Sequence, residues 1–272
     1  MVSRAATARK QDFDPHEALG RAQTLFYDVC DARTAKKRIA IAKKALSISP
    51  LCADAYVLLA EHEKRGSDEA LDLWRRGVEA GKTALGDDFE DFQGEFWGFL
   101  ETRPYMRARF GLAWALWERG EHDEAISHLQ SMLVLNPNDN QGVRYVLADW
   151  LIETERDDEL AVLLNEYRED IMADWAWTTA LAAYRREGDS KNSRKLLKDA
   201  LTSNEHISAY LLGEKALPKS LPPFISLGGV DEAVHYVNGS SDGWHKTPGA
   251  IDWLRAQIQP AKKQKPKKPA KS

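Results

Sequence analysis

Residues 106–137, MRARFGLAWALWERGEHDEAISHLQSMLVLNP, have the pattern of one helix–turn–helix unit of the tetratricopeptide type. Small and apolar residues recur where two antiparallel helices would touch: Leu112, Ala113, Leu116, Ala125 and Leu129. Gly120 stands between the two predicted helices, where glycine adopts a positive φ at little cost. Pro137 follows at the place where this repeat carries its terminal proline. One such unit cannot bury its apolar face alone, so neighbours are expected to stack on both sides.

Similar helix pairs are predicted along the rest of the chain. Apolar residues at helical spacing predict one pair over residues 18–31 and 34–48, and a second pair that begins at Ala53. After the central unit, a pair is predicted over residues 141–152 and 157–167, and another follows it. The fold class is therefore predicted to be all-α, a tetratricopeptide-repeat superhelix (α-solenoid), with helical repeats over residues 15–207 after a loose N-terminus at 1–14.

Residues 81–105, GKTALGDDFEDFQGEFWGFLETRPY, do not fit a repeat and are predicted to be an insertion. Aromatic and acidic residues alternate along it. Its rings would either pack over the seam between repeats or form a lid that contacts a partner, and the sequence leaves both interpretations open.

The C-terminal part loses the repeat register. Residues 208–259 are predicted to form a non-repeat helical cap, with a proline-broken loop before a helix that starts at Val230. Residues 260–272 are predicted to be a disordered tail, since they hold six lysines and no acid: Lys262, Lys263, Lys265, Lys267, Lys268 and Lys271. Such a tail could bind nucleic acid weakly, although it is more often only a solvated end.

Composition indicates a protein of the soluble, reducing cytoplasm. The chain has 272 residues, of which 43% are hydrophobic and 29% are charged, with a net charge of −4. The sequence has neither an apolar run of about 18 residues nor a secretory h-region, so no membrane role is expected. The two cysteines, Cys30 and Cys52, lie in apolar helical contexts and are expected to be buried, reduced thiols.

The sequence carries no recognisable pattern for catalysis. Its seven histidines are scattered, and His122 and His128 are six residues apart, which is not the spacing of a helical metal pair. His122 is expected to be a solvated turn residue. Phosphate-loop, dinucleotide-binding and nucleophile-elbow motifs are absent. We therefore expect no enzymatic activity, no catalytic residues, no cofactor, no metal and no small-molecule substrate.

The candidate binding residues come from the first helices of the repeats, which line the concave groove of a solenoid. Groove positions of the central repeat and of the one after it hold Arg107, Phe110, Trp114, Trp117, Gln141 and Arg144. Aromatic residues and arginine dominate binding hot spots. The alternative is that Trp114 and Trp117 pack against the insertion or a neighbouring repeat.

Several stretches resemble the suppression-of-tumorigenicity-seven family and its bacterial relatives. These stretches are ETRPYMRA at 101–108, LNPNDNQGVRY at 135–145, and NEHISAYLLGEKALP, EAVHYV and GAIDWL between residues 204 and 254. The resemblance covers residues 100–256. It implies a tetratricopeptide-like helical protein for which protein–protein interaction is the usual assignment, and it carries over no catalytic residue. The eukaryotic members are membrane-associated, but this chain lacks their apolar spans.

Together these observations predict a cytoplasmic, non-enzymatic scaffold or adaptor that binds a segment of a protein partner in its groove. The alternative is a regulatory protein that contacts nucleic acid through its basic C-terminal tail.

Overall fold

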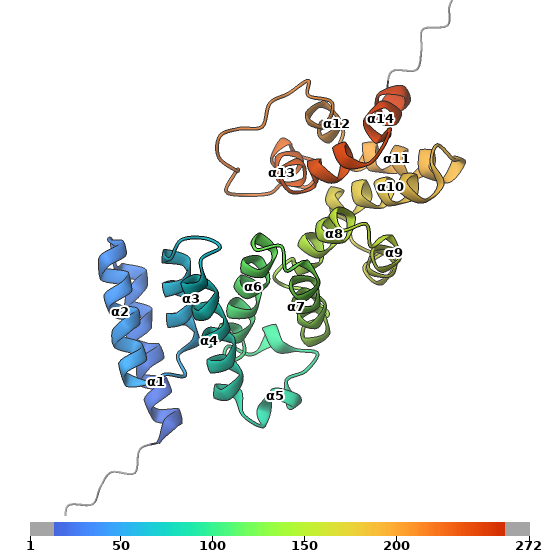
Figure 1. Cartoon of the computed structure of the whole chain (residues 1–272). Helices are drawn as coiled ribbons and strands as arrows, with labels where there is room; N and C mark the ends of the chain where they lie inside the picture. Colours follow the sequence, from blue (N-terminus) through green and yellow to red (C-terminus); the bar gives the residue numbers. More distant parts are fainter. Residues whose placement is uncertain (1–13, 259–272) are drawn as a thin grey trace, which may run out of the picture. The chain divides into compact units, whose positions relative to one another are not determined.

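The computed structural model describes residues 14–258, and every regular element within them is a helix (Figure 1). The chain divides into two compact units, residues 1–143 and 144–272, which are described separately below. The predicted all-α class and the packing of helices in adjacent pairs, as in an α-solenoid, are confirmed. The predictions for most of the N-terminus and for the tail at 260–272 lie outside the described residues.

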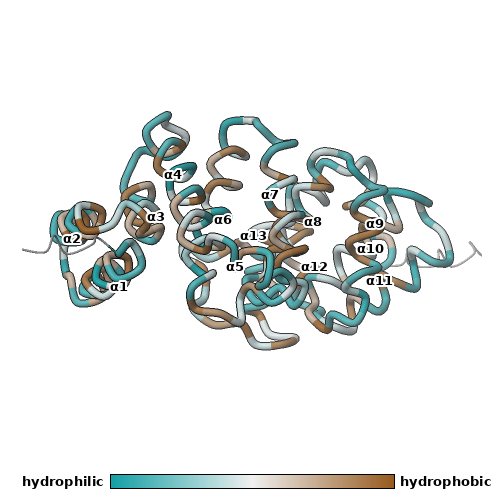
Figure 2. Tube along the Cα trace, turned by 90° about the horizontal axis from the view of Figure 1, so that it is seen from below, coloured by the Kyte–Doolittle hydropathy of each residue, from teal (hydrophilic) through white to brown (hydrophobic). Residues whose placement is uncertain are grey.

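The first unit contains helix pairs with an insertion between the second pair and the third. Its elements are α1 (Pro15–Phe26), η1 (Tyr27–Asp31), α2 (Ala35–Ile48), α3 (Ala53–His62), α4 (Asp68–Leu85), α5 (Asp88–Asp91), η2 (Phe96–Gly98), α6 (Arg103–Glu118) and α7 (His122–Leu135). α1 packs on α2, α3 on α4, and α6 on α7, while α4 and α6 join the second pair to the third. Along these helices the chain alternates between hydrophilic and hydrophobic residues, which gives each helix a face for the core (Figure 2).

The central pair, α6 and α7, forms as its sequence predicts. All of its predicted seam residues are buried: Leu112, Ala113, Leu116, Ala125 and Leu129. Gly120 ends the first helix with a φ of 80°, in the left-handed region that favours glycine. His122 is not a solvated turn residue: it opens α7, is half-buried, and its ring stacks on Trp117 at 4.1 Å between ring centroids.

Glycines allow α4 and α6 to cross closely. A Cβ atom at Gly81 would lie 2.9 Å from the backbone Cα of Tyr105, and one at Gly77 would lie 3.2 Å from the Cβ of Ala108. This crossing fixes the start of α6 against the end of α4. It therefore positions the two ends of the insertion, which leaves α4 after Leu85 and joins α6 at Arg103.

The insertion is shorter than predicted, because α4 extends to Leu85. Phe96 is fully buried, and the rings of Phe89 and Phe96 meet edge to face at 4.9 Å between centroids. Phe89 also packs against Tyr105 at 5.2 Å. The backbone N–H of Gly94 donates to the carbonyl of Leu135. These contacts anchor one side of the insertion to α6 and α7.

The second unit contains α8 (Val143–Glu153), α9 (Asp157–Glu166), α10 (Ala173–Glu187), α11 (Lys191–Ser203), α12 (His206–Leu211), α13 (Val230–Lys246) and α14 (Ala250–Ile258). α10 packs on α11 and also contacts α9, α13 and α14. Its core contains Trp177 and Trp244, whose ring centroids lie 5.7 Å apart. The helix predicted over residues 230–237 is longer in the structure, because helical residues continue to Lys246.

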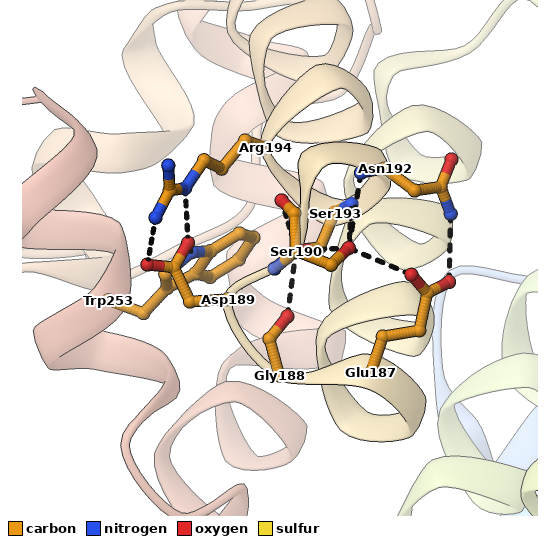
Figure 3. Close-up of polar contacts among 8 residues, drawn as sticks. All are labelled: Glu187, Gly188, Asp189, Ser190, Asn192, Ser193, Arg194 and Trp253. Atoms are coloured by element: carbon orange, nitrogen blue, oxygen red, sulfur yellow. Dashed lines mark hydrogen bonds and ion pairs between the residues drawn. The ribbon is translucent and has the colours of Figure 1, made fainter.

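The turn between α10 and α11 shows how polar residues end one helix and begin the next (Figure 3). Ser190 caps α11 by accepting from the backbone N–H of Ser193, whose hydroxyl accepts in turn from the N–H of Ser190. Asp189 accepts two bonds from the guanidinium of Arg194 and one from the indole N–H of Trp253 on α14. The turn thereby holds α14 against the α10–α11 pair.

The prediction that both cysteines are buried was wrong for one of them. Cys52 is buried, but Cys30 is exposed because it lies in η1, at the end of the first helix, rather than within a packed helix. No helix among residues 14–258 combines the length and the apolar character that a membrane span requires.

Candidate functional site

A cavity of about 750 Å³ lies in the first unit, between α1, the end of α4, the insertion and the start of α6. This volume falls within the range of about 300–1,000 Å³ that is typical of binding pockets. Its lining is mostly apolar, with a few polar groups. The lining residues are His16, Leu19, Gly20, Gln23, Tyr27, Leu51, Ala53, Gly81, Ala84, Leu85, Asp88, Phe92, Leu100, Glu101, Arg103, Pro104 and Arg107.

An ion pair and a hydrogen bond to the same carboxylate connect three helices at the cavity. Arg107 on α6 donates from Nε and Nη2 to the two carboxylate oxygens of Asp54 on α3, each bond being 2.8 Å long. Asp54 is buried, and it also accepts a 2.9 Å bond from the amide of Gln23 on α1. The paired oxygens of Asp54 thus fix the guanidinium of Arg107, and about two fifths of the Arg107 side chain stays exposed.

A buried thiol lies beside this ion pair. The Sγ of Cys52 is 3.6 Å from the side-chain oxygen of Gln23. Burial raises the pKa of Cys52 to about 11, so the thiol is protonated at neutral pH and unreactive as a nucleophile. The cavity therefore contains no activated cysteine.

Arg103 lies one helical turn before Arg107 and lines the same cavity. Its Nε donates to the carbonyl oxygen of Trp97 at 3.1 Å, and its guanidinium lies 5.2 Å from the centroid of the Trp97 ring. The insertion therefore holds Arg103 in place through both a hydrogen bond and a cation–π contact.

Large apolar side chains are exposed at the rim of the cavity. Tyr27 is 61% exposed and Leu100 is 68% exposed, and both belong to the lining. Phe92, also in the lining, packs on Phe99 at 4.3 Å between ring centroids, and Phe99 is itself partly exposed. Contiguous exposed apolar groups of this kind mark interaction sites in soluble proteins.

The insertion carries an excess of negative charge next to these apolar groups. Between Leu85 and Arg103 it has six carboxylates and no lysine or arginine, while Lys82 on α4 and Arg103 on α6 flank it. The carboxylates form no ion pair with any residue in the described range 14–258, and they are Asp87, Asp88, Glu90, Asp91, Glu95 and Glu101. Asp88 and Glu101 lie in the lining of the cavity. We call these six residues the acidic segment.

The predicted groove residues do not all lie together. Arg107 lines the cavity. Three others lie further along α6 or after α7 and are partly buried: Phe110, Trp114 and Gln141. Phe110 and Trp114 meet edge to face at 6.5 Å between centroids, and Trp117 stacks on His122. Their role in binding a partner stays a prediction.

Arg144, the sixth predicted groove residue, belongs to the second unit and is mostly buried there. Its Nε donates to Asp170 at 2.7 Å, and its guanidinium lies 4.3 Å from the centroid of the Tyr145 ring. The hydroxyl of Tyr145 donates to the same carboxylate oxygen of Asp170. Through these contacts Arg144 helps to hold the second unit together. Its role in binding a partner stays a prediction.

Most of the cavity lining was not predicted from the sequence, including Tyr27, Leu51, Leu85 and Leu100. The available signal was the composition of the insertion, in which aromatic and acidic residues alternate. Of the two interpretations of that segment, the burial of Phe96 agrees with rings that pack on the repeats, and contact with a partner stays a prediction.

The second unit contains carboxylates that have few partners. Asp149 on α8 accepts a 2.7 Å hydrogen bond from the Ser240 hydroxyl on α13, and its pKa is raised to about 7, mainly by burial and also by the charge of Glu153. Burial, together with the charges of Asp149, Asp170 and Glu232, raises the pKa of Asp174 on α10 well above its usual value. No group of three or more His, Cys, Asp or Glu side chains within residues 14–258 is arranged to hold a metal ion.

Comparisons with known proteins find relatives at low identity. The chain is 27% identical over 254 residues to the human suppressor of tumorigenicity 7 protein-like, an alignment that covers 82% of this chain and 43% of the human protein. The bovine protein of the same name is 26% identical, with 82% and 44% covered. The ST7 homolog of Caenorhabditis elegans is 26% identical over 266 residues, with 82% and 48% covered.

The chain thus spans less than half the length of these relatives. No model of a known protein family matches it, and no solved structure matches it either. The alignments cover more of the chain than residues 100–256, on which the sequence resemblance was based. The resemblance to the suppressor-of-tumorigenicity-7 proteins is confirmed, and these proteins are homologues of the chain over most of its length.

Proposed function

We propose that the protein is a non-enzymatic scaffold of the cytoplasm that binds a segment of a partner protein in the cavity of its first unit. The observation that carries this proposal is the position of Tyr27 and Leu100, two large and mostly exposed apolar side chains, at the rim of that cavity. A bound segment would bury both of them, and burying a side chain of this size contributes about 1.5–3 kcal/mol.

The homologues and the paired-helix fold favour a protein-interaction scaffold in general terms. The cavity makes the proposal specific, because residues of the first helices α1, α3 and α6 contribute to its lining, and first helices line the binding surface of helical-repeat proteins. The Asp54–Arg107 pair holds two of these helices in fixed register. A pre-formed surface loses little entropy when a segment binds to it.

The test uses two matched variants of the full chain, Leu100→Asp and Val162→Asp. Leu100 and Val162 are both 68% exposed, but Leu100 lines the cavity whereas Val162 lies on α9 of the second unit. Each change adds one negative charge to an exposed apolar site and should alter stability by less than about 0.5 kcal/mol. Affinity capture with quantitative mass spectrometry compares the partners that each variant retains.

We expect Leu100→Asp to lose partners that the wild-type chain and Val162→Asp both retain. Equal retention by the two variants would show that the cavity is not the binding surface. Loss with Val162→Asp alone would place the surface on the second unit instead.

A further inference from the structure

We propose that the cavity of the first unit selects a short peptide segment in which an apolar anchor residue is flanked by lysine or arginine. This inference rests on the proposed function and specifies the chemistry of the partner. It combines two observations on one surface: the apolar lining with its exposed rim, and the uncompensated charge of the acidic segment.

The apolar lining of the cavity determines which kind of peptide residue can serve as the anchor. Leu19, Leu51, Leu85 and Phe92 line the cavity, and Tyr27 and Leu100 extend the apolar surface outward. A side chain such as leucine or phenylalanine that enters this cavity replaces water next to apolar walls. Anchors of this type carry most of the free energy in peptide recognition.

The charges around the cavity determine which residues should flank the apolar anchor of the peptide. Asp54 already neutralises Arg107 through two hydrogen bonds, so that arginine adds no net charge to the cavity. Arg103 then stands against Asp88 and Glu101 in the lining. Because the rest of the acidic segment lies in the same insertion and lacks ion pairs within residues 14–258, the field at the entrance is negative.

Several acids on the helices of the first unit form ion pairs, unlike those of the acidic segment. Glu17, Asp72 and Glu118 form ion pairs with Arg21, Arg76 and Arg65. These three acids thus have cations from the same chain, whereas the six carboxylates of the acidic segment form no ion pair within residues 14–258. Lysine or arginine from a partner would supply the missing cations, which favours that partner over neutral or acidic peptides.

The experiment selects peptides without assuming a sequence. A phage-displayed library of random short peptides is panned on the full chain, and binders that also bind the Leu100→Asp variant are removed. We expect the remaining peptides to be enriched in lysine or arginine next to an aromatic or aliphatic residue. Enrichment in aspartate or glutamate, or no preference for charge, would overturn the inference while leaving the proposed function intact.

A selected peptide is then synthesised with a fluorescent label, and its affinity is measured by anisotropy. The double variant Asp88→Asn, Glu101→Gln should bind it at least about tenfold more weakly at low salt, and the difference should shrink as salt screens the charges. The control Glu69→Gln, Glu79→Gln removes the same charge from exposed positions outside the cavity lining and should bind as wild type does.

Three further outcomes are decisive. Equal affinity of the two double variants would refute the role of the acidic segment. A library that yields no peptide dependent on Leu100 would refute both the inference and the proposed function. A chain whose six tail lysines are changed to glutamine should bind the peptide no more tightly than wild type. Tighter binding by that chain would mean that the tail itself is the basic occupant, and this would contradict a separate partner.

Discussion

The two units of the chain place carboxylates among their helices in contrasting ways. In the first unit, Asp54 is buried but accepts a guanidinium fork from Arg107 and an amide bond from Gln23. In the second unit, Asp149 accepts a single side-chain hydrogen bond within residues 14–258, from the hydroxyl of Ser240. Its pKa is raised to about 7. A buried carboxylate is stabilised by charge-assisted bonds in one case and by holding its proton in the other.

Because of this difference, the carboxylates of the two units affect different properties: the exposed charge of the first unit and the pH dependence of the stability of the second. The first unit satisfies its buried Asp54 internally, and the acidic segment on the insertion forms no ion pair within residues 14–258. In the second unit, burial raises the pKa of both Asp149 and Asp174, and the charge of Asp149 raises that of Asp174 further, so the stability of this unit should depend on pH.

Removing the cation of the first unit should have the largest effect. Arg107→Leu leaves Asp54 buried with only the Gln23 amide as its side-chain donor, and we expect a loss of about 2–4 kcal/mol in the free energy of unfolding. The lower part of this range allows for the exposed fraction of the Arg107 side chain. Urea unfolding followed by circular dichroism measures the loss. Arg107→Lys keeps the charge but not the paired hydrogen bonds, so its stability should lie between those of wild type and Arg107→Leu. A loss below about 1 kcal/mol for Arg107→Leu would mean that water replaces the ion pair.

Asp149→Asn should raise the free energy of unfolding, relative to wild type, as the pH increases, whereas Arg107→Leu lowers it. The pKa of Asp149 rises from an ordinary value near 4 to about 7 on folding, so the folded state holds a proton that the unfolded chain releases between these values. This carboxyl's contribution is fully present below about pH 4 and is lost as the pH rises through 7. Asparagine cannot ionise, so the stability of the variant relative to wild type should rise between pH 5 and pH 8 by about 1 kcal/mol or more.

Hydrogen exchange with mass spectrometry measures this effect in peptides from α10 and α13, which belong to the second unit. The control is Asp54→Asn in the first unit, which should be destabilising at both pH values because its carboxylate accepts the Arg107 fork. The same pH dependence in Asp149→Asn and in wild type would contradict the assignment of the switch to Asp149.

A sequence can predict features that depend on local spacing, and it predicted them here. The α6–α7 seam followed from positions four and twelve residues apart, and the turn at Gly120 followed from the need for a positive φ. The cavity depends on contacts between distant segments. Asp54 and Arg107 are 53 residues apart, and their pairing requires α4 to cross α6 at Gly81. No spacing rule encodes that crossing, so Tyr27 and Leu100 could not be assigned to one rim in advance.

Ser240→Ala should have the smallest effect. It removes the single hydroxyl that donates to Asp149, at a cost of about 1 kcal/mol where the carboxylate is ionised. The loss of this bond also raises the pKa of Asp149 further, because the hydroxyl favours the ionised form. A carboxyl-detected NMR titration of Asp149 measures the pKa directly. An unchanged pKa would show that the Ser240 hydroxyl does not lower the pKa of Asp149.

The central claim is that the cavity of the first unit binds a peptide segment of a partner. Hydrogen exchange of the full chain, with and without a peptide selected on it, tests this claim most directly. We predict slower exchange in α1 and at the insertion, over residues 16–27 and 84–104, and no change in the second unit. Protection confined to the exposed apolar loop at 212–229, which carries Leu221, Phe224 and Leu227, would contradict the account and move the binding surface to that loop.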